Sequence, residues 1–146
     1  MNRIVVGVDG SEGSANALRF ALEEARVRGA EMQVVSTWRI PPMLYGAGLG
    51  LVPPISGDDF EEIARKAQDK AVAETGADGG EVRLTRLVRE GQAADVLCDL
   101  AAGADLLIVG SRGLGGFSGL LLGSVSQQCA HHAPCPVVIV PSAREA

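Results

Sequence analysis

The sequence predicts a doubly wound α/β domain, in which helices cover both faces of a mostly parallel sheet. Short runs of β-branched and aliphatic residues alternate along the chain with longer segments whose apolar residues recur at helical spacing. The short runs are continuously apolar, which is typical of parallel strands buried on both faces. At 146 residues the chain has the usual length of one compact domain. We therefore expect residues 1–146 to form a single domain with right-handed crossovers.

The individual elements follow from these patterns. Strands are expected at residues 4–8, 32–38, 81–88, 106–109 and 136–140, and helices at about 14–28, 58–75, 92–102 and 124–131. Ser14 is the expected N-cap of the first helix and Gly29 its C-terminal stop, while Asp58 or Asp59 is expected to cap the second helix. Residues 41–57 contain four prolines and four glycines, which exclude regular structure. This loop is unusually apolar, and the sequence leaves open whether it covers a ligand or contacts a partner.

Composition and charge exclude several classes of partner. Acidic residues outnumber basic ones by 18 to 13, which gives a net charge of −5, and no long basic run is present. Binding to nucleic acid or to an anionic membrane surface is therefore not expected. No apolar stretch approaches the roughly 18 residues of a membrane-spanning helix, and the chain begins directly with a strand pattern, without a signal-peptide layout. Three cysteines are too few for a disulfide framework, so we expect a soluble cytoplasmic domain.

Glycines concentrate in one segment that follows a predicted strand and precedes a predicted helix. Six of the 19 glycines lie between Gly110 and Gly123. In open α/β sheets, ligands bind beyond the carboxyl ends of the strands, where residues 7–11 and this loop both have suitable chemistry. Glycines let the backbone approach a phosphate or adopt positive φ, and amides at a helix start donate to anions. Arg112 and Ser124 add a cation and a hydroxyl, although the lysine-containing phosphate loop and the dinucleotide fingerprint are both absent.

The spacing Gly110-x2-Gly113-x9-Gly123-Ser124 resembles the ATP-binding signature of universal stress proteins, G-x2-G-x9-G-[S/T]. The resemblance covers nearly the whole chain, because residues 4–11, residues 132–137 and the alternation of five strands with helices also fit. It implies a sheet ordered 3-2-1-4-5, with the first and fourth strands adjacent where the chain reverses its winding direction. It also implies ATP as the ligand and a regulatory role in stress response or persistence.

The same resemblance implies a role for each position of the motif. Asp9 corresponds to the family's acid near the nucleoside, with Gly7 close to it, and Thr37 lies where the family recognises adenine through backbone atoms. The glycine loop would line the ribose and phosphates, and the next helix would offer amides and hydroxyls to the phosphates. The expected ATP-binding residues are Gly7, Asp9, Thr37, Gly110, Arg112, Gly113, Gly123, Ser124, Val125 and Ser126. A Mg²⁺ or Mn²⁺ ion would be held mainly by the phosphates and water, with help from the hydroxyl of Ser124 or Ser126.

Three hypotheses about function stand side by side: a regulatory ATP-binding protein, an enzyme that cleaves or transfers from ATP, and a nucleotide-free interaction module. Fast phosphoryl transfer needs carboxylates that hold the metal and a positioned base. Asp9 is the only carboxylate expected at the site, so we expect no catalytic residues and slow hydrolysis at most. The intact glycine motif disfavours the nucleotide-free module.

Each motif also has a purely structural interpretation. Asp9 begins an Asp-Gly-Ser sequence, which forms turns and helix caps without any ligand, and the glycine loop could serve as a linker. The residues Cys129, His131, His132 and Cys135 match no common zinc spacing. A buried thiol and a helix-terminal histidine pair are therefore expected there rather than a metal site, and Cys98 is expected on the core side of the third helix.

Assembly is predicted from the two edges of the sheet order that the resemblance implies. The third strand carries Arg83 and Arg86, whose charges discourage pairing with another edge. The fifth strand is apolar on both faces and is bracketed by Pro136 and Pro141. Such an edge exposes unpaired backbone groups beside aliphatic side chains, so we expect two fifth strands to pair antiparallel about a two-fold axis. The resemblance also implies this homodimer.

Overall fold

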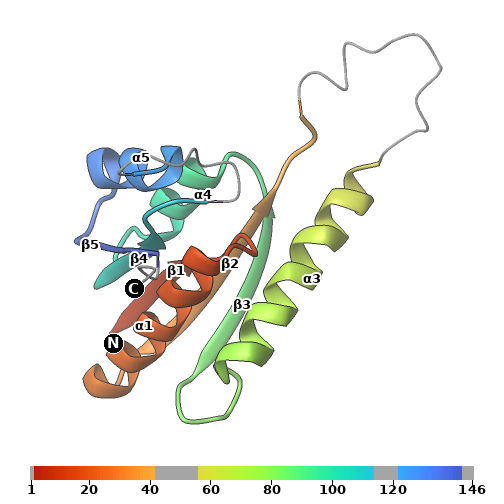
Figure 1. The fold of residues 1–146 in the computed structure, drawn as a ribbon. Coiled ribbons are helices and arrows are strands. Elements are labelled where there is room, and N and C mark those ends of the chain that lie inside the picture. Colours follow the sequence, from red (N-terminus) through yellow and green to blue (C-terminus); the bar gives the residue numbers. More distant parts are fainter. Residues whose placement is uncertain (1, 42–55, 114–121, 143–146) are drawn as a thin grey trace, which may run out of the picture.

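Five parallel strands form one sheet in the computed structural model, which describes residues 2–41, 56–113 and 122–142. Their spatial order is β3-β2-β1-β4-β5 (Figure 1). The strands are β1 (Arg3–Gly7), β2 (Glu31–Trp38), β3 (Leu84–Glu90), β4 (Leu106–Gly110) and β5 (Val137–Val140), and the helices are α1 (Glu12–Arg28), α3 (Gly57–Thr75), α4 (Ala93–Leu100) and α5 (Ser124–His132). The predicted α/β class and the order 3-2-1-4-5 are confirmed.

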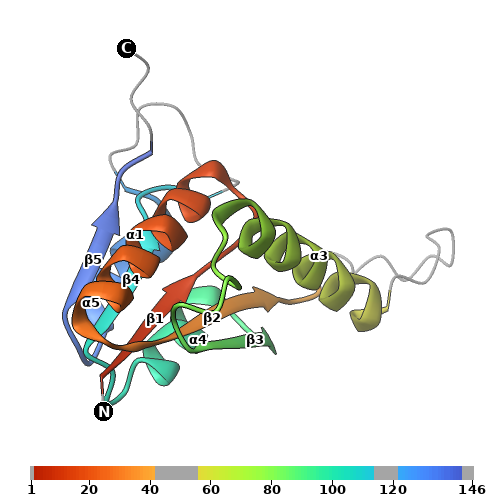
Figure 2. The ribbon, with the colours of Figure 1, turned by 90° about the horizontal axis from the view of Figure 1, so that it is seen from below.

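Helices cover both faces of the sheet. α1 and α3 lie on one face, and α4 and α5 lie on the other (Figures 1 and 2). Successive side chains of a strand point to opposite faces, so Ile4 and Val6 of β1 face α1 while Val5 faces α4. All three are fully buried. The sheet is therefore apolar on both faces, as the continuous apolar runs predict.

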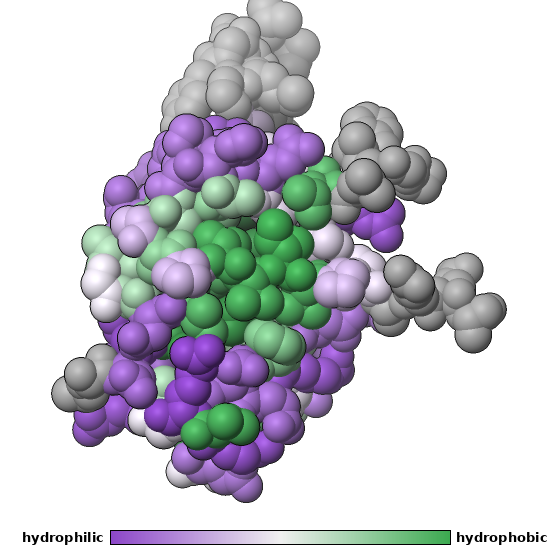
Figure 3. Space-filling view, turned by 90° about the vertical axis from the view of Figure 1, so that its left-hand side faces the viewer, coloured by the Kyte–Doolittle hydropathy of each residue, from purple (hydrophilic) through white to green (hydrophobic). Residues whose placement is uncertain are grey.

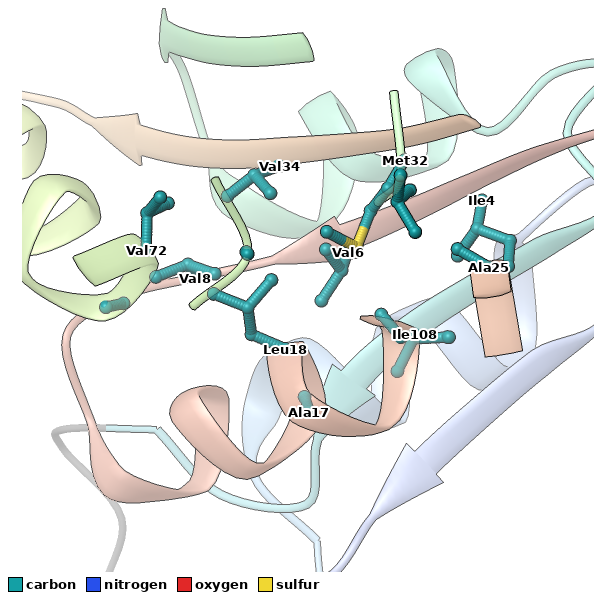
Figure 4. Packing of buried hydrophobic residues seen from close by; sticks show 14 of the residues in the cluster. Ile4, Val6, Val8, Ala17, Leu18, Ala25, Met32, Val34, Val72 and Ile108 are labelled. Carbon is teal, nitrogen blue, oxygen red and sulfur yellow. The ribbon is translucent and has the colours of Figure 1, made fainter. Parts of the chain in front are cut away.

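The core beneath α1 is built of small aliphatic side chains rather than aromatic rings. Ala17 and Ala25 of α1 pack over Val6 and Ile108 of the sheet (Figure 4). Aromatic residues make up only 3% of the chain. Alanines on the buried side of a helix let its axis approach the strands closely, and this close packing positions the start of α1 at the end of the sheet.

Two helices begin at other residues than the sequence pattern predicts. Ser11, not Ser14, caps α1, because the Ser11 side chain accepts a hydrogen bond from the Ser14 amide at 3.1 Å. Ser56 precedes α3 and forms a capping box with Asp59, so neither Asp58 nor Asp59 is the N-cap. Serines and aspartates all have capping chemistry, and the path of the incoming chain decides which of several neighbours acts. The predicted stop of α1 at Gly29 is confirmed, with φ of 64°.

The third strand is shifted from its predicted position at residues 81–88. β3 pairs with β2 from Met32↔Leu84 to Trp38↔Glu90, so it ends where its partner ends. Arg83 consequently lies before the strand rather than in it. Arg86 remains on this edge and forms an ion pair with Asp69 of α3.

A pair of glycines sets the distance between β4 and α1. A Cβ at Gly110 would lie 2.8 Å from the carbonyl carbon of Gly13 and 3.2 Å from the nitrogen of Ser14. A Cβ at Gly13 would in turn lie 2.9 Å from the carbonyl oxygen of Arg112. These separations are shorter than van der Waals contact, so only glycine lets the two backbones meet. The first turn of α1 therefore rests directly on the end of β4.

Within the part of the chain that the structure describes, no helix is long and apolar enough to cross a membrane. In the same residues, every buried side-chain nitrogen or oxygen has a hydrogen-bond partner. The apolar loop expected at residues 41–57 falls almost wholly on residues 42–55, which lie outside the described residues.

Replacing Gly110 by alanine is expected to destabilise the domain by about 1–3 kcal/mol, because its methyl group would overlap the backbone of α1. Gly57→Ala is the matched control: its Cβ would lie 3.0 Å from a ring atom of the half-buried Trp38 side chain rather than against backbone. We expect the control to change the free energy of unfolding by less than about 0.5 kcal/mol. Urea denaturation measures both values, and equal effects would contradict the proposed glycine contact.

Candidate functional site

A cleft opens at the carboxyl ends of β1, β2 and β4, where the winding direction of the chain reverses. About 500 Å³ of space lies between its walls and the open solvent at its mouth. Ser124 is exposed at the start of α5 and does not line the cleft. The other nine predicted site residues do: Gly7, Asp9, Thr37, Gly110, Arg112, Gly113, Gly123, Val125 and Ser126.

Asp9 takes part in the turn that leads from β1 into α1. Its Oδ1 accepts hydrogen bonds from the amide of Ser11 at 2.9 Å and from the hydroxyl of Ser11 at 2.5 Å. Ser11 in turn caps α1 through the Ser14 amide. Asp9 Oδ1 therefore supports the structural interpretation, because it holds Ser11, the residue that caps α1.

The second carboxylate oxygen of Asp9 faces Gly113, and residues 114–121 of the glycine-rich segment lie outside the described residues. A Cβ at Gly113 would lie 2.7 Å from Asp9 Oδ2, so the absence of a side chain lets the backbone of Gly113 approach the carboxylate. Of the two roles that the sequence allows these glycines, positive φ is found at none of Gly110, Gly113 and Gly123. Close approach of backbone to neighbouring atoms explains all three. The positive φ at this site belongs to Gly10, at 89°, where the chain turns toward α1.

The first turn of α5 closes one side of the cleft. Its N-cap is Gly123, whose amide donates to the carbonyl of Ser111 at 2.6 Å. Glycine has no side chain to cap the helix, and no side-chain cap is formed. The first amides of α5 therefore remain available for an anion, which the positive end of the helix dipole also favours.

The two serines at this helix start differ in what they can donate. The hydroxyl of Ser126 is buried and points back to the carbonyls of Ser111 at 2.9 Å and Gly123 at 3.0 Å. Its single proton is engaged, so Ser126 stabilises the loop and keeps only lone pairs for a ligand. The hydroxyl of Ser124 accepts from Gln128 at 2.9 Å and retains its own proton for donation.

Arg112 is the cation of the cleft. It lines the wall between the end of β4 and α5, and none of the ion pairs formed within residues 2–41, 56–113 and 122–142 involves it. Together with the start of α5 it makes one end of the cleft positive. Asp9 is the only acidic residue among the described side chains that line the cleft.

The apolar wall of the cleft includes residues that the sequence reasoning missed. The missed apolar residues are Val35, Ala93, Leu97 and Val109. The cleft is also lined by Ser14 and by Val8 and Ser11 of the segment 7–11. Val35 precedes Thr37 by two residues on the same face of β2, so strand alternation identifies it once Thr37 is chosen. Leu97 comes from α4, and a Cβ at Gly7 would lie 2.9 Å from its Cδ1. No local pattern links α4 to the cleft.

The cysteines and histidines near the C-terminus form no metal-binding group among the residues that the structure places. Cys129 is fully buried, as predicted, and His131 and His132 end α5 as an exposed pair. Cys98 and Cys135 are half-buried and pack against the same cluster as Cys129. Burial raises the pKa of the Cys129 thiol to about 12.

Comparison with known proteins gives one consistent family. The sequence profile of the universal stress protein family matches residues 1–141. A universal stress protein of Mycolicibacterium smegmatis is 34% identical over 139 residues, covering 94% of this chain and 45% of that protein. A Thermus aquaticus universal stress protein is 35% identical over 143 residues, covering 94% and 96% of the two chains. The chain thus spans less than half of the first relative and nearly all of the second.

Solved structures agree with this comparison. A universal stress protein in complex with cAMP has a TM-score of 0.65 and 29% identity, covering 97% of this chain and 98% of that one. The universal stress protein from Archaeoglobus fulgidus in complex with dAMP has a TM-score of 0.64 and 28% identity, covering 96% and 98%.

Cys129 is expected to resist alkylation by iodoacetamide at pH 8, because a thiol whose pKa is about 12 is almost entirely protonated there. Unfolding in urea should expose it to rapid labelling, which mass spectrometry of peptides detects.

The unperturbed thiol has a pKa of 9.0, so the unfolded chain loses this proton first. The contribution of Cys129 to stability is complete below pH 9 and declines as the pH rises toward 12. Rapid labelling of the native protein at pH 8 would contradict this environment.

Proposed function

Because this chain belongs to the universal stress protein family, we propose that it binds ATP in the cleft and acts as a nucleotide-dependent regulator in stress response or persistence. The observation that carries the proposal is the meeting of Asp9, the motif glycines Gly110, Gly113 and Gly123, and the uncapped start of α5 around one cleft. Relatives crystallised with cAMP and dAMP support an adenine nucleotide as the ligand. We propose that the 146 residues act as one nucleotide-binding domain.

The chemistry of the two ends of the cleft sets the orientation of the nucleotide. Val35, Leu97 and Val109 offer an apolar wall that suits a purine base, next to the backbone of Thr37. Asp9, with Gly7 beside it, is positioned to accept from ribose hydroxyls, as a carboxylate does well.

Beyond the nucleoside, the ligand is expected to meet donors. Gly110, Arg112 and Gly113 would contact the ribose and the first phosphate, and the amides of Ser124, Val125 and Ser126 would hold the remaining phosphates, with Gly123 as the N-cap that leaves them exposed. A Mg²⁺ or Mn²⁺ ion would be held mainly by phosphate oxygens and water, with the hydroxyl of Ser124 or a lone pair of Ser126 as an additional ligand.

The proposal favours regulation over catalysis. Phosphoryl transfer at typical enzyme rates uses several carboxylates around the metal and a group that positions the nucleophile. Asp9 is the one carboxylate that the described part of the cleft provides, and the proposal assigns it to the nucleoside rather than to the phosphates. An enzyme acting on ATP is the alternative, and it requires acidic groups from elsewhere. A nucleotide-free interaction module is the second alternative, and it leaves the uncapped start of α5 without a role.

The edge strand β5 supports a homodimer. Among the described residues β5 pairs with β4 alone, and its four residues are half-buried. Val138 and Val140 pack against one core cluster, and Val137 and Ile139 against the other. Figure 3 faces the side on which β5 lies in Figure 1, and it shows an apolar area bordered by polar residues. We propose that two β5 strands pair antiparallel across a two-fold axis and cover this edge.

Nucleotide bound after purification tests the ligand. Wild-type protein is expected to release ATP on denaturation, identified by mass spectrometry. Gly113→Val should fold yet carry little nucleotide, because a Cβ there lies 2.7 Å from the Asp9 carboxylate and the branched side chain closes the gap. Gly57→Val, outside the cleft, is the control and should retain ATP. Wild-type nucleotide content in Gly113→Val would refute the assignment of the site.

Turnover separates regulator from enzyme. With Mg²⁺ and saturating ATP, phosphate release is expected to remain far below about 1 s⁻¹, the lower end of typical enzymes. The measurement follows inorganic phosphate under single-turnover and steady-state conditions. Turnover at or above that rate would replace the regulatory proposal by the enzymatic alternative.

The mass of the assembly tests the dimer. Light scattering is expected to give about 30 kDa, twice the chain mass of 15.1 kDa. Ile139→Lys should shift the protein toward monomer, because a charge on β5 opposes edge pairing. Ile63→Lys is the matched control, since Ile63 is already 65% exposed on α3, and it should stay dimeric. A wild-type chain that remains monomeric at high micromolar concentration would exclude this interface.

A further inference from the structure

A pair of polar side chains is buried between β2 and α3, on the face of the sheet opposite to Val35 and Leu97 of the cleft. Ser36 of β2 is 2% exposed and Gln68 of α3 is 1% exposed. Gln68 Nε2 donates to Ser36 Oγ at 3.2 Å. Burying an amide and a hydroxyl costs several kcal/mol unless both are hydrogen-bonded, so this pair holds a defined geometry.

The surroundings of Gln68 decide the direction of each hydrogen bond. Its Nε2 also donates to the carbonyl of Leu87 in β3 at 2.9 Å, and its Oε1 accepts from Arg86 Nε at 3.3 Å. The guanidinium can only donate, which places the amide oxygen toward Arg86 and the nitrogen toward Ser36. Ser36 Oγ therefore accepts from Gln68 and directs its own proton to the carbonyl of Val8, 2.7 Å away.

The carbonyl of Val8 belongs to the peptide unit that leads into Asp9. The Val8 amide still donates to the carbonyl of Val35 in β2 at 2.9 Å, and the hydroxyl of Ser36 holds the Val8 carbonyl directly after this last backbone hydrogen bond between β1 and β2. On its other edge the same peptide unit donates through the Asp9 amide to Ser14 Oγ at 3.2 Å. A peptide unit is planar, and two hydrogen bonds on opposite edges determine its orientation.

We infer that Ser36 and Gln68 are positioning residues for the nucleotide site, which orient the Asp9 carboxylate by holding the peptide unit before it. The inference rests on the proposed function, because it assigns Asp9 to the nucleoside. Neither side chain lines the cleft, although Ser36 borders a neighbouring hollow together with Asp9 and Thr37. Because the hydroxyl of Ser36 is bonded to the peptide unit before Asp9, we assign its effect on the ligand to Asp9. The ion pair between Arg86 and Asp69 anchors the outer end of this chain of contacts at the surface.

The test is a double-mutant cycle, read as the Kd for ATP by isothermal titration calorimetry in the presence of Mg²⁺. Asp9→Ala is expected to weaken binding by about 10- to 150-fold, as for loss of a hydrogen bond to a charged group. Ser36→Ala should weaken it by about 3- to 10-fold. The double variant should bind no more weakly than Asp9→Ala alone. Ser36 acts by orienting the Asp9 carboxylate, so its loss has no further effect once that carboxylate has been removed.

Three further variants separate positioning from general stability. Ser36→Thr keeps the hydroxyl and should restore most of the affinity. Gln68→Met removes the donor to Ser36 and should show the same non-additivity with Asp9→Ala, and it carries the test if Ser36→Ala does not fold. Thr75→Ala is the control: it removes a hydroxyl bonded to the Ala71 carbonyl at 2.8 Å at the far end of α3, and it should leave the Kd unchanged.

The possible failures are distinguishable. If Asp9→Ala weakens ATP binding but Ser36→Ala does not, or if the two losses add fully, the positioning role is overturned while the nucleotide site stands. If the wild-type chain binds no ATP, or Asp9→Ala leaves the Kd unchanged, the proposed role of Asp9 fails and the inference fails with it.

Discussion

The contact between the end of β4 and the first turn of α1 is the constraint on which the site depends. Gly110 and Gly13 bring these two backbones closer than any side chain would allow. Since β1 and β4 are neighbours in the sheet, the turn after β1 and the loop after β4 then leave the sheet at the same place. A methyl group at either glycine would separate them, and the cleft would lose the side on which Asp9 faces Gly113.

Backbone groups, more than side chains, make up the binding chemistry of this cleft. The uncapped start of α5 offers amides, and the glycines mainly remove obstacles to close approach. Side chains such as Ser126 and Ser11 are largely occupied in holding those backbone segments in place. A site of this kind suits retention of an anionic ligand, because its donors are preorganised and need little rearrangement. It is poorly equipped for rapid chemistry, which needs acids and bases near the reacting atoms.

The buried pair of Ser36 and Gln68 connects the end of β1 with β2, β3 and α3. Most of the α3 interface is apolar, yet Gln68 spans from β3 through β2 to Ser36 and so reaches the end of β1. Buried polar networks of this type are retained only when every member is satisfied. Here each buried group has its partner. The pair therefore holds the end of β1 from the α3 face of the sheet.

The sequence by itself determined the elements and their order along the chain, because strand and helix periodicity and turn chemistry act over a few residues. It also contains the spacing of the three motif glycines. It did not determine which capping residue acts at α1 or α3, nor where β3 ends, since neighbours in space select among locally equivalent choices. Only the tertiary structure decided that Leu97 of α4 lines the cleft and that Gln68 supports Ser36. These contacts join residues that are 30 or more positions apart in the sequence, and no short-range pattern encodes which of them meet. It also decided that the motif glycines serve close approach rather than positive φ, because that choice depends on what stands opposite them.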